Sequence, residues 1–293
     1  MRLSVLIVAA DSGASLLECV RRALASTAVD DVLVMDNASA DGIPDALERE
    51  HAGDARLRVV RNGANLGFGP AMNRAAALAA GDQLLLLNPD CLLGDGDVEA
   101  LQHTLATEPR AGLVGAVVCD ADGTPDPASR RRDPLLRRSL NTLTGRAARE
   151  ADDPRCAGIP VPGPMPVGVE EEEAVSGALM LMPRAVFDAL HGFDEAYFLH
   201  CEDLDLCRRV RDAGWRVLLD GRVRVLHAKG GSSRHRPVFV SRHKHRGMWR
   251  WFRKFDPAAR NPLLAGIVWC GIWGHFTLGC VKVAVRRWAG HRG

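Results

Sequence analysis

The chain has 293 residues, enough for one large domain or two small ones, and its 47% apolar content suffices for a full hydrophobic core. Its eight cysteines include no CxxC pair, which argues against a zinc site, and the N-terminal apolar run is too short for a secretion signal. We therefore expect reduced thiols and a cytoplasmic location.

The net charge of +2 hides an uneven distribution of charged residues. From Arg222 to the end there are 16 lysines and arginines but one acidic residue, Asp256, whereas the preceding part has 22 basic and 35 acidic residues. A basic tail on an acidic body predicts a polyanionic partner, either a membrane surface or a nucleic acid.

Strand and helix patterns alternate over the first 90 residues. Short runs of Val, Ile and Leu predict buried strands, and apolar residues at helical spacing predict a helix after each of the first three. The strands are expected within 2–12, 30–36, 56–62 and 83–90, and the helices within 16–26, 43–52 and 67–81. This alternation predicts an α/β fold with a mostly parallel sheet flanked by helices.

Three polar residues lie at or just after predicted strand ends: Asp36, Asn65 and Asp90. Ligands bind at the carboxyl ends of strands in such sheets, so this placement favours a site. Asp36 could accept hydrogen bonds from a base or ribose, or it could cap the next helix. Asp90 ends the run LLLLNPD and could hold a cation on a diphosphate, although Asn-Pro-Asp is also typical of a plain turn.

Residues 121–172 are rich in proline, glycine and charge. We interpret them as a long mobile loop rather than a domain. The arginines at 130–132 and 137–138 could contact phosphates, or they could belong to a solvated basic loop.

A strand and a helix are expected again within 174–195, followed by a helix that starts near residue 202 and stops at Gly214. Glu202 and Asp203 would lie in its first turn, where acids favour the helix dipole but can also act as a general base. Residues 215–227 predict two short strands, and His227 ends an inward-facing row. His227 is a candidate metal ligand, with a core or surface histidine as the alternative.

Five motifs in this order resemble family 2 glycosyltransferases of the GT-A fold, in the branch that includes rhamnosyltransferases of cell-surface polysaccharide synthesis. They are VLVMDNASADG at 32–42, NGANLGFGPAMNRA at 62–75, LLLLNPD at 84–90, the stretch 176–217 and VRVLH at 223–227. The resemblance covers about residues 3–230. It implies a Rossmann-like GT-A domain over residues 1–235, in which 121–172 are a long variable loop.

The resemblance also implies a metal-dependent, inverting, single-step reaction. A sugar, rhamnose from dTDP-rhamnose or another sugar from a UDP-sugar, would pass to a hydroxyl of a lipid-linked or polysaccharide acceptor. Asp203 would be the base and Glu202 would lie on the acceptor side, while Asp90 and His227 would hold Mg²⁺ or Mn²⁺ on the donor diphosphate.

The nucleotide side would be formed by Ala9, Asp11, Asp36, Asn65 and Asn88. Two departures stand out. Ala9, Ala10 and Asp11 replace the family's usual Thr-Tyr-Asn, and Asn88 replaces the first acid of its usual Asp-x-Asp.

The tail, residues 236–293, combines basic, aromatic and apolar stretches. Residues 233–255 interleave Arg and Lys with Trp and Phe without a nucleic-acid-binding motif, so an anionic membrane fits better than a nucleic acid. Residues 263–281 are apolar apart from His275 and just long enough to span a bilayer. We expect membrane association at the inner face of the cell membrane, through a spanning or interfacial helix, with a core-closing helix as the alternative.

Two other functions fit parts of the sequence. A sugar nucleotidyltransferase would also use an α/β sheet and a metal, but it would want a basic glycine-rich loop after the first strand, and AADSGAS at 9–15 has no basic residue. A non-catalytic nucleotide-sugar-binding module would account for the departures at 9–11 and Asn88.

Overall fold

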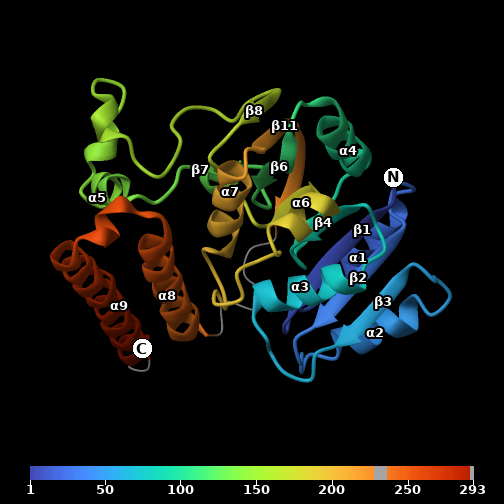
Figure 1. Ribbon diagram of the computed structural model, residues 1–293. Coiled ribbons are helices and arrows are strands. Elements are labelled where there is room, and N and C mark those ends of the chain that lie inside the picture. Colours follow the sequence, from blue (N-terminus) through green and yellow to red (C-terminus); the bar gives the residue numbers. More distant parts are fainter. Residues whose placement is uncertain (228–235, 291–293) are drawn as a thin grey trace.

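A computed structural model describes residues 1–227 and 236–290. Its centre is a nine-stranded sheet in the order β3-β2-β1-β4-β10-β6-β11-β5, with β8 paired to β11 outside this path (Figure 1). The strands are β1 Leu3–Ala9, β2 Asp31–Asp36, β3 Leu57–Arg61, β4 Gln83–Leu87, β5 Cys91–Leu92, β6 Ala111–Cys119, β8 Val169–Glu171, β10 Leu179–Pro183 and β11 Arg216–His227. A separate pair joins β7 Arg130–Arg131 to β9 Ala174–Val175.

The sheet is mixed but mostly parallel. Strands β3, β2, β1 and β4 run parallel, β10 is antiparallel to both β4 and β6, and β11 runs parallel to β6. This confirms the predicted fold class and places the carboxyl ends of β1, β2 and β4 at one edge.

Helices cover both faces of the sheet. They are α1 Ser15–Ala25, α2 Ile43–Glu50, α3 Phe68–Leu78, α4 Asp97–Thr107, α6 Arg184–Ala189 and α7 Glu202–Asp212. Along β1 the residues Leu3, Val5 and Ile7 enter one core cluster, with α1 and α4, whereas Leu6 and Val8 enter the other, with α3, α6 and α7. The period of two explains why β1 reads as an unbroken apolar run.

The long loop expected at 121–172 contains several short regular elements. This segment contains β7, the helix α5 Leu136–Leu143, β8 and three 3-10 helices, Pro127–Ser129, Arg146–Arg149 and Pro154–Cys156. Several of the arginines proposed as phosphate ligands instead pair with carboxylates: Arg130 with Glu172, Arg132 with Glu150 and Arg138 with Glu173. These partly buried ion pairs hold in place a segment whose proline and glycine content suggested a loop.

The prediction of two strands at 215–227 is also wrong, because β11 is continuous. It shifts register against β6 between Asp220 and Arg224, so an irregularity rather than a turn lies where the sequence reads DG. Beyond the shift Val223 and Val225 are buried, and His227 ends the strand as predicted.

The tail contains two long helices that differ in burial. Helix α8 Pro237–Phe255 packs onto the sheet domain through the buried Trp251 and Phe252, and Lys254 pairs with Asp205 of α7 at 2.6 Å. The stretch 233–255 was expected to lie on a membrane, but the α8 part of it also closes the core through these two side chains. The predicted boundary at 235 adjoins residues 228–235, which lie outside the described part of the chain.

Helix α9 Pro262–Gly290 lies beside α8 (Figure 1). Its segment Pro262–Val285 is long and apolar enough to cross a membrane, and only 6% of its most apolar window is buried. A core helix of that composition would be covered by protein, so α9 leaves an apolar face for another surface.

We expect Trp251→Ala to destabilise the protein by about 3–5 kcal/mol, because it removes a large side chain that is 1% exposed. Trp269→Ala in α9 is the matched control, since Trp269 is 48% exposed and should cost under about 1 kcal/mol. Chemical denaturation in detergent would measure both. Equal losses would contradict the assignment of α8, but not α9, to the folded core.

Candidate active site

A pocket of about 1230 Å³ opens at the carboxyl ends of β1 and β4 and extends along α5, α8 and α9. The predicted site residues on its lining are Asp11, Asn65, Asn88, Asp90, Glu202, Asp203 and His227. The fold therefore brings together side chains from segments far apart in the sequence, at the edge of the sheet where ligands were expected.

Asp90 and His227 are neighbours. His227 Nε2 lies 3.0 Å from Asp90 Oδ1 and 3.5 Å from Asn88 Nδ2. The sheet register produces this contact, because His227 pairs with Cys91 across β11 and β5, and Asp90 immediately precedes Cys91. The Asn-Pro-Asp segment is thus a turn that links β4 to β5 and presents Asp90 to the pocket.

The donor set of this corner fits a cation that is held partly by its substrate. Within residues 1–227 and 236–290 no group of three or more His, Cys, Asp or Glu side chains is placed to hold a metal. One carboxylate and one imidazole would leave most positions of an octahedral ion to phosphate oxygens and water, which is how Mg²⁺ and Mn²⁺ commonly bind in nucleotide sites.

Two residues predicted on the nucleotide side, Ala9 and Asp36, do not line the pocket, although their neighbours Ala10 and Asn37 do. Ala9 is buried within β1, and its carbonyl accepts a hydrogen bond from the Asn37 backbone N–H. The Asp36 carboxylate accepts one from the Ser39 backbone N–H at 2.9 Å and another from Arg61 at 3.1 Å. Asp36 thus shapes the turn after β2 and does not cap α2, whose N-cap position is Gly42 without a side-chain cap.

Asn37, beside Asp36, is the residue that reaches the pocket from this turn. Its side-chain amide donates to the Gly67 carbonyl at 3.0 Å and accepts from Asn62 at 2.7 Å. Asp11 lines the pocket and also accepts from the Ala40 backbone N–H at 2.7 Å. These bonds fix the loops after β1, β2 and β3 against each other.

Glu202 and Asp203 form the first turn of α7, as predicted, and both line the pocket. The loop before them is unusual, because His200 and Cys201 have positive φ angles of 69° and 71°. Non-glycine residues adopt this conformation at a cost, and such strain concentrates at functional sites. A β-carbon at Gly177 would lie 3.0 Å from that of Asp203, so the strand entry packs closely on this carboxylate.

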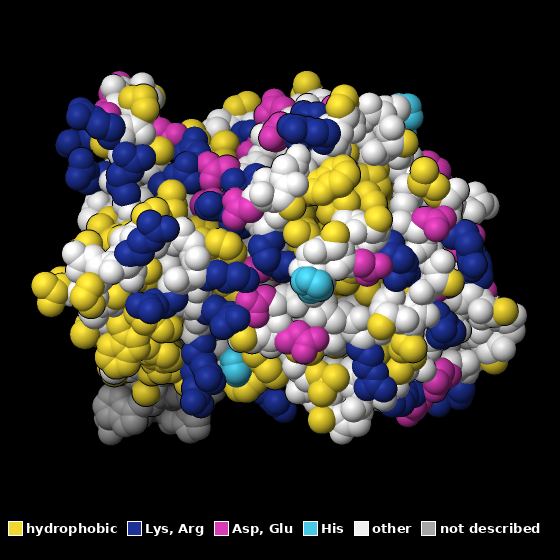
Figure 2. All heavy atoms as spheres, in the orientation of Figure 1, with side chains coloured by type: hydrophobic (Ala, Val, Ile, Leu, Met, Phe, Trp, Pro, Cys, Tyr) yellow, Lys and Arg dark blue, Asp and Glu magenta, His cyan; other side chains and the backbone are white. Residues whose placement is uncertain are grey.

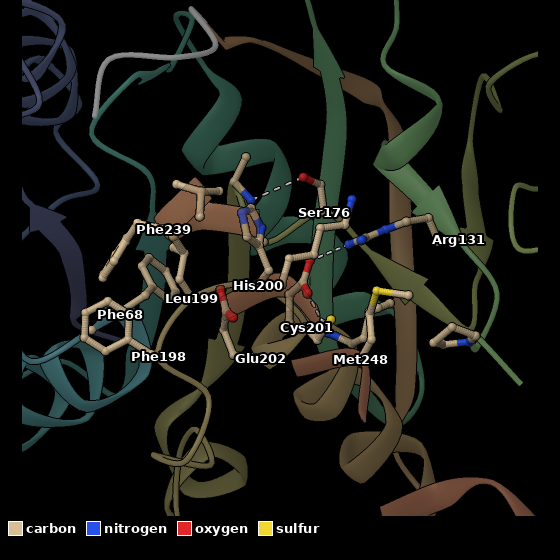
Figure 3. Close-up of a pocket in the computed structure, with 18 of the residues that line it drawn as sticks. Phe68, Arg131, Ser176, Phe198, Leu199, His200, Cys201, Glu202, Phe239 and Met248 are labelled. Atoms are coloured by element: carbon tan, nitrogen blue, oxygen red, sulfur yellow. Dashed lines mark hydrogen bonds and ion pairs between the residues drawn. The ribbon is translucent and has the colours of Figure 1, made fainter. Parts of the chain in front are cut away.

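Arg131 of β7 forms a close ion pair with Asp203. Burial raises the pKa of the Asp203 carboxyl, but the charge of Arg131 and its hydrogen bond outweigh burial and lower the pKa overall. Asp203 is therefore ionised at neutral pH. Figure 3 shows Arg131 reaching toward the start of α7 from the side opposite to Phe68 and Phe198.

Glu202 has the opposite electrostatic environment. Burial, with the charge of Asp203 as a second cause, raises the pKa of the Glu202 carboxyl. The side chain is 8% exposed, and its Oε2 is buried without a hydrogen-bond partner. A buried carboxyl oxygen that lacks a partner is suited to meet a polar group of a bound ligand.

Aromatic side chains form a wall of the pocket. Phe198 packs edge-to-face on Phe239 of α8 with 5.6 Å between ring centroids, and Phe68 lies on the same side (Figure 3). Gly67, with φ of 91°, allows the Phe68 backbone N–H to donate to the Phe198 carbonyl at 2.9 Å, because a β-carbon at Gly67 would lie 2.7 Å from that oxygen. The glycines of the GFG motif therefore dock α3 onto the loop that precedes α7.

Sequence reasoning missed several residues of the site. The sequence suggested only phosphate contacts for the arginines at 130–132, and no periodicity singles out Arg131 as the partner of Asp203. Asn37 could have been found, because it follows Asp36 in the same strand-end motif. Gly177 carries a weaker signal, as a glycine directly before an apolar strand.

Comparison with known proteins agrees with the predicted resemblance. The model of the family described as glycosyl transferase family 2 matches residues 4–159. An N-acetylglucosaminyl-diphospho-decaprenol L-rhamnosyltransferase of Mycobacterium tuberculosis is 32% identical over 268 residues, which cover 80% of this chain and 82% of the relative.

Solved structures share the fold. A mannosyltransferase from Pyrobaculum calidifontis, in complex with GDP-Man and Mn²⁺, superposes with a TM-score of 0.60 at 19% identity and covers 90% of this chain and 68% of its own. GalNAc-T7 with UDP, GalNAc and Mn²⁺ gives 0.62 at 16% identity, over 89% of this chain and 50% of its own. At these identities the likeness supports the GT-A-like fold.

Glu202→Gln should raise the melting temperature by a few degrees at about pH 8 and leave it unchanged at about pH 4. The folded-state pKa of Glu202 is raised, so ionisation costs stability as the pH climbs above the usual glutamate range, and glutamine removes that cost. Calorimetry across this range would measure it. Glu50→Gln, an exposed glutamate of α2, is the control, and an equal response of both variants would contradict the raised pKa.

Proposed function

The chain belongs to glycosyl transferase family 2, and we propose that it is an inverting, metal-dependent rhamnosyltransferase that acts on a lipid-linked acceptor at the membrane. The observation that carries the proposal is one pocket in which an ionised carboxylate, Asp203, and the Asp90–His227 pair lie together. The mycobacterial relative, named for rhamnosyl transfer to a diphospho-decaprenol sugar, supports this donor and acceptor class.

In this proposal Asp203 is the general base. It takes the proton of the acceptor hydroxyl, whose oxygen bonds to the anomeric carbon of the donor as the bond to the diphosphate breaks and the nucleoside diphosphate leaves. Attack opposite the leaving group inverts the anomeric centre. Arg131 keeps Asp203 ionised and oriented, and Glu202, with its unpartnered oxygen, is placed to orient the acceptor sugar.

The polar end of the pocket is the proposed nucleotide side. Asp11, Asn37, Asn65 and Asn88 line it and offer amide and carboxylate groups to a base and ribose. Asp90 and His227 would hold the divalent cation. When bound, the cation neutralises the charge that develops on the departing diphosphate.

The membrane location rests on α9 and on the relative's acceptor, and we place the enzyme at the inner face of the cell membrane. Figure 2 shows hydrophobic side chains gathered over α9 with lysines and arginines of α8 alongside. An apolar helix flanked by basic residues suits an anionic lipid surface.

The two other candidate functions lack support. The matching family is one of glycosyltransferases, and the mycobacterial relative is named as a glycosyltransferase; neither is a nucleotidyltransferase. A non-catalytic binding module would have no need for a base held ionised in the pocket. Release of dTDP from dTDP-rhamnose, dependent on a diphospho-lipid acceptor, tests both points, and a panel of UDP-sugars would measure the donor preference.

Asp203→Asn should reduce rhamnosyl transfer by about 10³-fold, because asparagine cannot accept the proton, while the Kd for dTDP-rhamnose stays unchanged. Radiolabel transfer and calorimetric donor binding would measure the two effects. Asp212→Asn, at the far end of the same helix, is the matched control. Turnover retained in Asp203→Asn would remove Asp203 as the base.

Asp90→Asn should weaken Mn²⁺ binding by at least about tenfold in the presence of dTDP, because it replaces a charged ligand by a neutral one. Electron paramagnetic resonance of free Mn²⁺ would measure binding without reference to turnover. Asp95→Asn, an exposed aspartate after β5, is the control. Unchanged Mn²⁺ affinity would show that the cation binds elsewhere.

A further inference from the structure

The pocket continues well beyond the catalytic carboxylates. Its volume of about 1230 Å³ exceeds the roughly 300–1,000 Å³ of common small-molecule sites, so it has room for more than a nucleotide sugar. Its continuation along the helices is mostly apolar, with a lining that includes Leu136, Leu140, Leu143, Leu264, Ile267 and Ile272.

Two helices that are distant in sequence form this apolar end. Helix α5 contributes its leucines from the segment 121–172, and α9 contributes a stripe in which positions 264, 267, 268, 271 and 272 follow helical spacing. Much of this lining is open to solvent: Leu140 is 50% exposed, Leu143 73% and Ile267 67%. Such a surface is costly in water unless something apolar covers it.

The apolar end leads toward the proposed membrane surface. Helix α9 carries further exposed apolar residues away from the pocket, including Leu278 at 64% and Val281 at 53%. Leu278 lies about three helical turns beyond Ile267 and on nearly the same side of α9, so the apolar side that lines the pocket continues along the helix into the surroundings. A chain lying in the pocket would pass into the lipid phase without crossing water.

We propose that the apolar end between α5 and α9 binds the first isoprene units of a polyprenyl diphosphate acceptor. This inference rests on the proposed function and deepens it. Lys244 and Arg236 of the α8 region line the same pocket and supply positive charge for the acceptor's diphosphate.

The acceptor's own chain fits this place better than an acyl chain of a membrane phospholipid. The apolar lining and the carboxylates Glu202 and Asp203 belong to one continuous pocket. A sugar whose hydroxyl meets Asp203 must send its diphosphate and lipid away from the donor side, and the apolar end is the exit that the fold provides. A phospholipid there would block the acceptor.

The test compares two acceptors, N-acetylglucosaminyl-diphospho-decaprenol and the same sugar diphosphate on a short alkyl chain, in detergent micelles. Leu140→Gln and Ile267→Gln should each lower kcat/KM for the decaprenyl acceptor by about tenfold, chiefly through KM, and leave the short acceptor unaffected. Leu278→Gln is the matched control, because Leu278 is as exposed as Ile267 but lies off the pocket.

Each outcome is decisive. Equal losses for Ile267→Gln and Leu278→Gln would mean that α9 acts only as a membrane anchor and would overturn the proposal. The proposal would also be overturned if the wild-type enzyme used both acceptors equally well. It would be overturned too if detergent-dispersed phospholipid inhibited transfer to both acceptors to the same extent. Absence of transfer to both acceptors would instead refute the proposed function, while intact transfer to the short acceptor keeps the two failures distinct.

Discussion

The structure depends on holding two adjacent carboxylates, Glu202 and Asp203, at the start of one helix inside a pocket. Burying a negative charge costs free energy, and ion pairs from the surrounding elements offset that cost. Arg131 of the segment 121–172 pairs with Asp203 of α7. In the other direction, Arg208 and Arg211 of α7 pair with the buried Asp133 of that segment. The segment and α7 therefore hold each other, which is why a proline-rich stretch is ordered beside the site.

The two carboxylates share their burial but not their chemistry. Both lose hydration, and the difference between them is the guanidinium of Arg131, which lowers the pKa of Asp203 while that of Glu202 rises. Neighbouring groups with opposite shifts are typical of acid–base sites, because one stays ionised while the other can hold a proton and donate a hydrogen bond. The strained backbone at His200 and Cys201 fits the same pattern. A positive φ angle costs conformational free energy, and such strain is found where the orientation of side chains matters for function.

The sequence predicted the parts of the site that local patterns encode. Strand ends placed Asp90 and His227, and the first helical turn placed Glu202 and Asp203, because these positions follow from periodicity within a short stretch. The pairing of Arg131 with Asp203 and the helix α5 were not predicted, because both depend on ion pairs with residues far along the chain, such as Arg138 with Glu173. The same reason applies to Asp36, whose carboxylate pairs with Arg61 of the next strand and does not line the pocket.

The uneven charge of the chain has two structural roles rather than one. Part of the basic tail docks α8 onto the acidic body, since Lys254 bridges Asp194 and Asp205 and Arg250 also reaches Asp194. This docking carries α9 to the edge of the pocket, and exposed arginines such as Arg242 and Arg246 remain on the outer side of α8. A transferase that joins a water-soluble donor to a lipid-anchored acceptor needs a polar and an apolar end within one cavity. By docking α8, these ion pairs hold the apolar end of the pocket at α9 next to its polar end at the sheet.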